Sequence, residues 1–266
     1  AGKLTLNEEQ EVEIAVSAYE ASLNLQIWKN YVDEIGVSVI HPGGTAIGPL
    51  QRIQGTQRFQ LGETNLLVYY GEPSPYNPYQ EIYLDFIPVG SYIDDGIWKI
   101  RLTPIRITDG AFDMWLPAGN VLNSGTGFLN PVEETTLTIP STATKVITVG
   151  AYDARFDQAA AFSGRGYTRA TNQVKPDLVA PGVEIMSCAP GGGYQVRTGT
   201  SMATPFVTGS AALLMQWGIT DGNDAYLYGE KMKAYLIRGA RRLPGFTAYP
   251  NPVLGWGALC TANSIP

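Results

Sequence analysis

The sequence predicts an all-β sandwich or jelly roll over residues 1–133 and part of an α/β domain with a parallel sheet over residues 134–266. Short alternating segments without a convincing helix fill the first half, whereas short β-branched runs followed by two helical segments fill the second half. The 30 Gly and 18 Pro residues among 266 favour turn-rich β-structure. This length is sufficient for two modest domains with buried cores.

The first half contains a succession of apolar and polar alternations, which are typical of half-buried strands. These segments are Val12–Val16, Leu23–Ile27, Val37–Ile40, Leu66–Tyr70, Ile82–Ile87 and Trp98–Ile107. The Asp95-Gly96 pair separates Tyr92-Ile93 from Ile97-Trp98, and it predicts a two-residue hairpin turn. About eight strands of this kind indicate two packed antiparallel sheets.

The second half begins with β-branched runs that are typical of buried strands: Thr136–Ile139, Lys145–Val149 and Val174–Val179. Residues 202–217 are apolar nearly all round, which predicts a core helix that ends at Gly218. Residues 230–243 are amphipathic and predict a second helix with arginines near its C-terminal end. These elements are too few for a complete parallel sheet, so we expect this half to be only part of a domain.

Charge and cysteine content exclude several classes of function. The formal net charge is −6, and no run of Lys and Arg is present, so we expect no nucleic-acid partner. The longest apolar runs are too short for a membrane span. Cys188 and Cys260 lack CxxC spacing in a chain with one His, which argues against a zinc site. Two buried thiols and one disulfide both remain open, and the chain begins without an initiator Met.

Ser201 follows Gly199-Thr200 at the point where an extended segment meets the long predicted helix. The free N–H groups and the dipole of a helix N-terminus favour negative charge beside such a hydroxyl, which suits a tetrahedral oxyanion. Pro205 falls in the first turn, where its missing N–H has little effect. The alternative interpretation is that Thr200 or Ser201 only caps the helix.

Five segments, spread over about residues 135–260, resemble the motifs of subtilisin-like serine proteases (subtilases, peptidase family S8) and occur in that family's order. They are Ile147–Ala151, Phe162–Gly166, Lys175–Gly182, Gly199–Gly209 (GTSMATPFVTG) and Pro252–Leu259. The resemblance implies the C-terminal part of a subtilisin-like catalytic domain. It implies peptide-bond hydrolysis through an acyl-enzyme at Ser201, with the N–H of Ser201 in the oxyanion hole. Gly199, Thr200 and Pro140 then belong to the substrate-binding region, although Pro140 also suits an ordinary strand-end turn.

The family also needs an Asp in a D-[ST]-G context and a His in an HGTH context, both before the Ser. His41 and Asp94 lie in superficially similar contexts, but they occur in the reverse order and in the strand-rich half. We expect His41 to be a loop residue and Asp94 to be a turn residue. A chymotrypsin-like interpretation fails because Ser201 lacks a GDSGG context and leads into a long helix. The chain alone is therefore expected to be inactive, with an upstream segment as the partner that carries the Asp and the His.

The segment Ala118-Gly119-Asn120 has the letters of the family's AGN motif, whose Asn contributes to the oxyanion hole. In subtilases that carry a β-sandwich insert, this motif generally comes before the insert, whereas here it follows the predicted strands. We therefore expect Asn120 to be a turn residue, and we do not assign it to the active site.

The arrangement resembles clostridial subtilases, including germination-type proteases, in which a jelly roll lies between the His and Ser motifs. The resemblance implies a secreted or spore-associated bacterial protein that acts on polypeptide substrates, with no cofactor and no assigned metal. Some relatives in this group are pseudoproteases, so a regulatory module that binds protein or glycan through the aromatic-rich sandwich is the alternative. Many of those aromatic residues alternate as core residues do.

Overall fold

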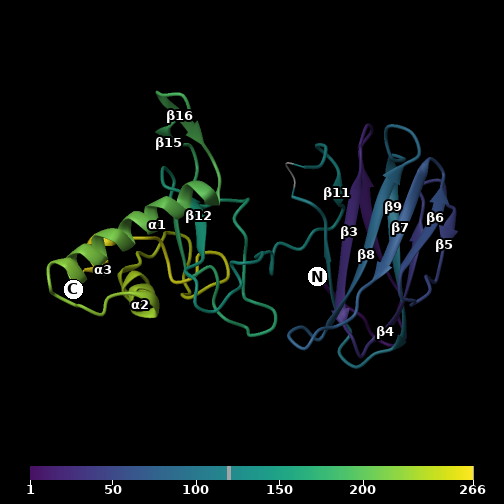
Figure 1. The fold of residues 1–266 in the computed structure, drawn as a ribbon, viewed down its shortest axis with the longest axis horizontal. Helices are drawn as coiled ribbons and strands as arrows, with labels where there is room; N and C mark the ends of the chain where they lie inside the picture. Colours follow the sequence, from purple (N-terminus) through teal and green to yellow (C-terminus); the bar gives the residue numbers. More distant parts are fainter. Residues whose placement is uncertain (119–120, 266) are drawn as a thin grey trace. The chain divides into compact units, whose positions relative to one another are not determined.

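The computed structural model describes residues 1–118 and 121–265. The chain divides into two compact units, Ala1–Val132 and Glu133–Pro266, each with its own hydrophobic core (Figure 1). None of the described helices has the length and apolarity that a bilayer crossing requires.

The first unit is a sandwich of two antiparallel sheets (Figure 1). One sheet has the strand order β1 (Gly2–Lys3), β10 (Ala111–Trp115), β3 (Leu23–Asn30), β8 (Tyr79–Pro88), β7 (Thr64–Tyr70), β6 (Thr56–Leu61). The other has the order β11 (Gly127–Phe128), β2 (Gln10–Val16), β9 (Gly96–Arg106), β4 (Glu34–Ile40), β5 (Ala46–Ile47). Alternate residues of both sheets are buried in one shared core, as the period-2 pattern predicts.

The second unit has a short sheet in which β12 (Val149–Asp153) pairs in parallel with β14 (Leu178–Pro181). The remaining elements are β13 (Gln158–Ala159), the hairpin β15 (Ile185–Cys188) and β16 (Tyr194–Arg197), α1 (Thr200–Met215), the π-helical turn η1 (Gln216–Thr220), α2 (Gly229–Gly239) and α3 (Thr261–Ser264). Helix α1 packs on the sheet and on α2 through Ala203, Val207 and Leu214.

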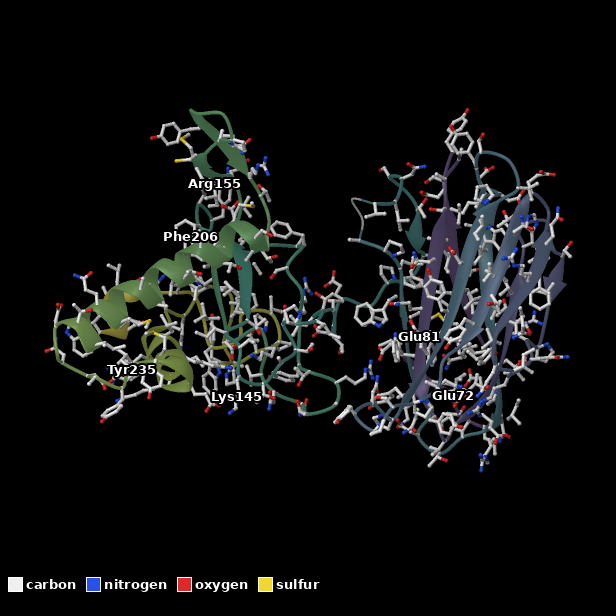
Figure 2. The ribbon with its side chains drawn as sticks, in the orientation of Figure 1. Glu72, Glu81, Lys145, Arg155, Phe206 and Tyr235 are labelled. Atoms are coloured by element: carbon white, nitrogen blue, oxygen red, sulfur yellow. The ribbon has the colours of Figure 1, made fainter. Side chains whose placement is uncertain are left out.

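Only one face of α1 is buried among the described residues. Phe206, Leu213 and Met215 are 41%, 56% and 41% exposed, respectively, although the helix is apolar nearly all round (Phe206 is labelled in Figure 2). An apolar helix normally buries most of its circumference. The described chain therefore covers only one side of α1, whose first turn contains Ser201.

The Asp95-Gly96 hairpin prediction is wrong. Strand β8 ends at Pro88 and pairs with β3 and β7, whereas β9 begins at Gly96 in the opposite sheet and pairs with β2 and β4. The intervening residues form a connection between the two sheets rather than a tight turn within one sheet. Local turn chemistry alone does not specify which sheet receives the next strand.

Several predicted bounds in the second half are also wrong. Residues 136–139 and 145–148 are irregular rather than strands, and the second helix ends at Gly239 instead of continuing to Leu243. Gly218 does not cap the first helix, because the chain continues through it as a π-helical turn. An added Cβ at Gly218 would lie 2.8 Å from Leu227 Cδ2, so this glycine permits close packing instead.

Candidate active site

Ser201 lies in the first turn of α1 and is exposed. The helix is capped by Gly199, and no side chain provides a capping hydrogen bond. The alternative interpretation, in which Thr200 or Ser201 is only a capping residue, is therefore wrong. Over residues 1–118 and 121–265, the Ser201 hydroxyl has no hydrogen-bond partner. It is available to an external group.

The start of α1 also provides donors beside this hydroxyl. The N–H of Ser201 lies in the first turn, where no helical carbonyl precedes it by four residues. In the same turn, the N–H of Met202 donates to the carbonyl of Gly199 at 3.0 Å. The positive end of the helix dipole lies at the same place and favours negative charge there. No acidic residue occupies this first turn to compete for the donors. The local geometry can therefore stabilise an oxyanion that forms next to Ser201.

Two segments of the second unit line a cavity of about 230 Å³ beside Ser201. One segment is the irregular stretch around Pro140, and the other is the start of α1. The lining residues are Pro140, Ser141, Val146, Ile147, Thr148, Val149, Thr200, Ser201 and Thr204. The structure thus brings Pro140, Thr200 and Ser201 together, while Gly199 lies directly before them as the helix cap. A mixed apolar and hydroxyl lining of this kind suits a substrate side chain.

A second hollow of about 480 Å³ opens from Ser201 along the exposed side of α1, where Thr204, Pro205 and Thr208 line it. Sequence reasoning missed Thr204, which borders both hollows. It also missed the contribution of residues 141–149. Thr204 lies three residues after Ser201, and this spacing puts both residues on one face of a helix. The spacing could therefore have predicted that Thr204 borders the site.

The model of the Subtilase family matches residues 116–257, more than half of the chain. The chain belongs to the Subtilase family. It is 34% identical over 169 residues to Serine protease AprX of Bacillus subtilis, in an alignment that covers 56% of this chain and 36% of AprX. It is also 46% identical over 77 residues to the Intracellular serine protease of Paenibacillus polymyxa, covering 29% of this chain and 21% of that protein.

This subtilase also has a close structural relative in the Clostridium perfringens CspB protease. The two share 38% sequence identity with a TM-score of 0.89, over 99% of this chain and 55% of that chain. The fold is therefore subtilisin-like. The chain spans about a third of AprX and about half of CspB.

His41 and Asp94, which we expect to be loop and turn residues of this subtilase, contact each other in the first unit. Nε2 of His41 lies 3.3 Å from Oδ2 of Asp94, and the N–H of Gly43 donates to Nδ1 at 2.9 Å. Because Nδ1 accepts a hydrogen bond, the neutral ring carries its proton on Nε2, facing the carboxylate. Both ring nitrogens therefore face groups of the first unit, and the role of His41 as a loop residue stays a prediction.

The carboxylate of Asp94 also accepts hydrogen bonds from residues that are distant in the sequence. Its Oδ2 accepts hydrogen bonds from the N–H of Glu63 at 2.8 Å and from Oγ1 of Thr64 at 2.7 Å. Burial raises the pKa of Asp94, but the hydrogen bond from Thr64 and the nearby His41 ring outweigh this effect and hold the pKa below its ordinary value. The pair thus holds loops of the sandwich together.

The remaining candidates are Asn120 and the two cysteines. Asn120 lies outside the described residues. Both cysteines are free thiols, so no disulfide joins them. The expectation of two buried thiols is also wrong, because Cys188 is exposed and Cys260 is half-buried.

Proposed function

We propose that the chain carries the nucleophile of a serine endopeptidase, and that Ser201 is this nucleophile. The observation that carries the proposal is the exposed Ser201 hydroxyl in the first turn of α1, which has no hydrogen-bond partner among the described residues and lies beside its own N–H and a cavity. Membership of the Subtilase family supports the same role. The substrate would be a polypeptide, with one side chain in the cavity between Pro140 and Thr200.

In this proposal, Oγ of Ser201 attacks the carbonyl carbon of the peptide bond while a histidine accepts its proton. The N–H of Ser201 stabilises the resulting oxyanion. The C–N bond then breaks, the histidine returns the proton to the leaving amine, and an acyl-enzyme remains. Water hydrolyses this ester and regenerates Ser201.

The histidine and its orienting aspartate are proposed to come from a polypeptide segment outside these 266 residues. The single His of the sequence is His41, and its ring nitrogens face Gly43 and Asp94. The uncovered apolar face of α1 and the partial coverage of the relatives are consistent with such a segment. We therefore expect residues 1–266 alone to be inactive.

We further propose that residues 1–133 are a jelly-roll insert in a catalytic domain whose C-terminal part is residues 134–266. Two antiparallel sheets around one core in the first unit support this proposal. The insert offers an exposed pair of aromatic rings, since Tyr19 and Tyr92 are 74% and 48% exposed and form an edge-to-face contact at 5.3 Å. This pair favours a second candidate function, a regulatory pseudoprotease that binds protein or glycan through the sandwich.

Hydrolysis of internally quenched peptides by the full-length gene product tests the first proposal. We expect internal cleavage, identified by mass spectrometry of the products, and a loss of several orders of magnitude in the Ser201→Ala variant. The Ser187→Ala variant, which changes a serine of the β15–β16 hairpin, is the control and should retain activity. Full activity in Ser201→Ala would contradict the proposal. A folded full-length protein that cleaves no peptide would favour the pseudoprotease.

A further inference from the structure

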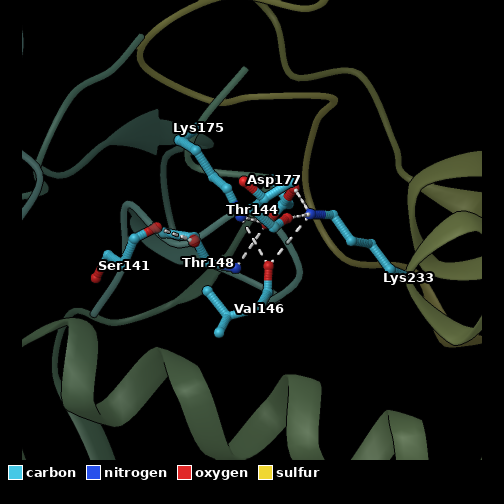
Figure 3. A network of polar contacts seen from close by, with 7 residues as sticks. All are labelled: Ser141, Thr144, Val146, Thr148, Lys175, Asp177 and Lys233. Carbon is cyan, nitrogen blue, oxygen red and sulfur yellow. Dashed lines mark hydrogen bonds and ion pairs between the residues drawn. The ribbon is translucent and has the colours of Figure 1, made fainter. Parts of the chain in front are cut away.

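The irregular segment 140–148, which lines the cavity beside Ser201, is held by side chains rather than by a sheet. Lys233 Nζ, from α2, donates to the carbonyl oxygens of Thr144 and Val146, both at 3.2 Å (Figure 3). Lys175 Nζ donates to the same Val146 oxygen at 2.7 Å. Backbone carbonyls without regular partners are costly to leave unsatisfied, so these ammonium groups fix the shape of the segment.

Asp177 joins the two lysines. Its Oδ2 lies 2.7 Å from Lys175 Nζ, and its Oδ1 lies 2.6 Å from Lys233 Nζ. Oδ2 also accepts the N–H of Thr148 at 2.7 Å. The hydroxyl of Thr148 in turn donates to the carbonyl of Ser141 at 2.6 Å. The network therefore runs from α2 to both ends of the segment (Figure 3).

The charges in this network are not equivalent. Lys175 and Asp177 have side chains that are only 1% and 3% exposed, whereas that of Lys233 is 17% exposed. Burial lowers the pKa of Lys175, the ion pair with Asp177 opposes this effect, and the nearby Lys233 lowers it further. Removal of Asp177 would leave the buried Lys175 ammonium without a counter-charge, which is strongly destabilising. Lys233 can be removed while the Lys175–Asp177 pair remains.

The segment held in this way also forms one wall of the cavity. Ser141, Val146 and Thr148 all belong to both the lining and the network. A shift of the Val146 carbonyl would therefore change the cavity without touching Ser201 or the first turn of α1. Small displacements of groups that orient a substrate have large effects on catalysis.

We propose that Lys233 is a positioning residue: it holds the carbonyl groups of Thr144 and Val146, and thereby keeps Val146 in place in the cavity wall for the substrate side chain. This inference rests on the proposed function of Ser201. Lys233 acts through the two carbonyl groups and Asp177, and it does not touch the reacting atoms. Its loss should weaken the binding of substrates that fill the cavity, and it should leave the reactivity of Ser201 intact.

The test uses the full-length gene product and a panel of peptides that differ only in the residue before the cleaved bond. In Lys233→Met, we expect kcat/KM to fall about tenfold or more for a peptide with Leu there, mainly through KM, and much less for a peptide with Gly. Lys233→Arg keeps a cation within reach and should restore most of the loss. Lys231→Met is the matched control, because Lys231 lies on the same helix and pairs with Asp224 at 2.6 Å, away from the cavity.

The rate of Ser201 modification by a small fluorophosphonate separates this inference from the proposed function. Modification at the wild-type rate in Lys233→Met, together with the selective loss for the Leu peptide, would support the positioning role. Equal losses for both peptides, an effect of the same size in Lys231→Met, or no loss at all would overturn it. Failure of the wild-type protein to react at Ser201 would instead contradict the proposed function.

Discussion

The N–H of Gly199 donates to the carbonyl of Gly182 at 2.8 Å, which joins the cap of α1 to the chain that leaves β14. The two segments also approach closely: an added Cβ at Gly182 would lie 3.0 Å from the Gly199 oxygen and 2.6 Å from Ala151 Cβ. Helix α1 begins at Thr200 directly after this contact, and Ser201 is its second residue. The position of the proposed nucleophile therefore depends on the absence of a side chain at Gly182.

The Gly182→Ala variant should be destabilised by about 1–3 kcal/mol, because the added methyl group overpacks the contact between β12 and α1. Chemical denaturation measures this change in the free energy of unfolding. The control is Gly209→Ala on α1, where an added Cβ meets no described atom within 4 Å and should stabilise the helix by up to about 1 kcal/mol. Equal stability of Gly182→Ala and the wild type would contradict the close contact.

Asp33 should stabilise the sandwich at neutral pH and lose this effect in acid. Burial raises the pKa of Asp33, but hydrogen bonds from the N–H groups of Thr108, Asp109 and Gly110 outweigh it and hold the pKa below the ordinary value of 3.8. Because the folded-state pKa is lowered, the stabilisation is present above pH 3.8 and is lost as the pH falls through the folded value. Asp33→Asn should cost on the order of 2–3 kcal/mol at pH 7.

The pH dependence of unfolding checks this expectation. Below about pH 4, the wild type should lose stability more steeply than Asp33→Asn, so the two curves should converge. Asp109→Asn is the control. Asp109 contacts Asp33 through its backbone N–H, and its own carboxylate is exposed, so this variant should leave the pH dependence of stability nearly unchanged. Parallel curves for the wild type and Asp33→Asn would show that the Asp33 carboxylate does not contribute in this way.

Phe86 should be a main contributor to the core that the two sheets of the sandwich share. It is fully buried and forms an edge-to-face contact with Trp98 at 5.1 Å. Phe86→Ala should cost about 3–5 kcal/mol, since it removes buried apolar surface and leaves a cavity. Tyr76→Ala, at an aromatic residue that is 97% exposed, should change stability by less than about 0.5 kcal/mol. Similar unfolding curves for the two variants would be incompatible with the assigned core.

Both cysteines should react with iodoacetamide in the native protein without prior reduction. Cys188 is exposed on the β15–β16 hairpin and should be alkylated faster than the half-buried Cys260. Intact-protein mass spectrometry counts the adducts over time. A protein that takes up no adduct until a reductant is added would show a disulfide instead of two thiols.

Period-2 alternation predicted the sandwich strands well where a strand has one buried face. Residues 23–27 fall within β3, whose side chains alternate between the core and the other face. The Asp95-Gly96 hairpin failed because the choice between two sheets depends on long-range packing. The strand prediction failed at residues 145–148. There the side chains of Val146, Ile147 and Thr148 line a cavity, and Lys175 and Lys233 bind the Val146 carbonyl.

The residues around Ser201 could be predicted because they are contiguous in the sequence and form a recognisable family motif. Pro140 could be predicted from its order relative to the other motifs. The contact of Lys233 with the cavity wall could not be predicted, because Lys233 lies on α2, far in the sequence from Val146. A lysine on an amphipathic helix has no local sequence pattern that indicates such a contact. The His41–Asp94 contact was missed for the same reason, since its partners lie far apart in the sequence.

Labelling with a fluorophosphonate probe tests the central claim most directly: that Ser201 is a nucleophile activated by groups outside these 266 residues. The probe is applied to the full-length gene product and to residues 1–266, and the modified peptide is identified by mass spectrometry. The account predicts rapid modification of Ser201 in the full-length protein, absent in Ser201→Ala, and no modification of residues 1–266. Equally rapid modification of Ser201 in residues 1–266, or none in the folded full-length protein, would contradict it.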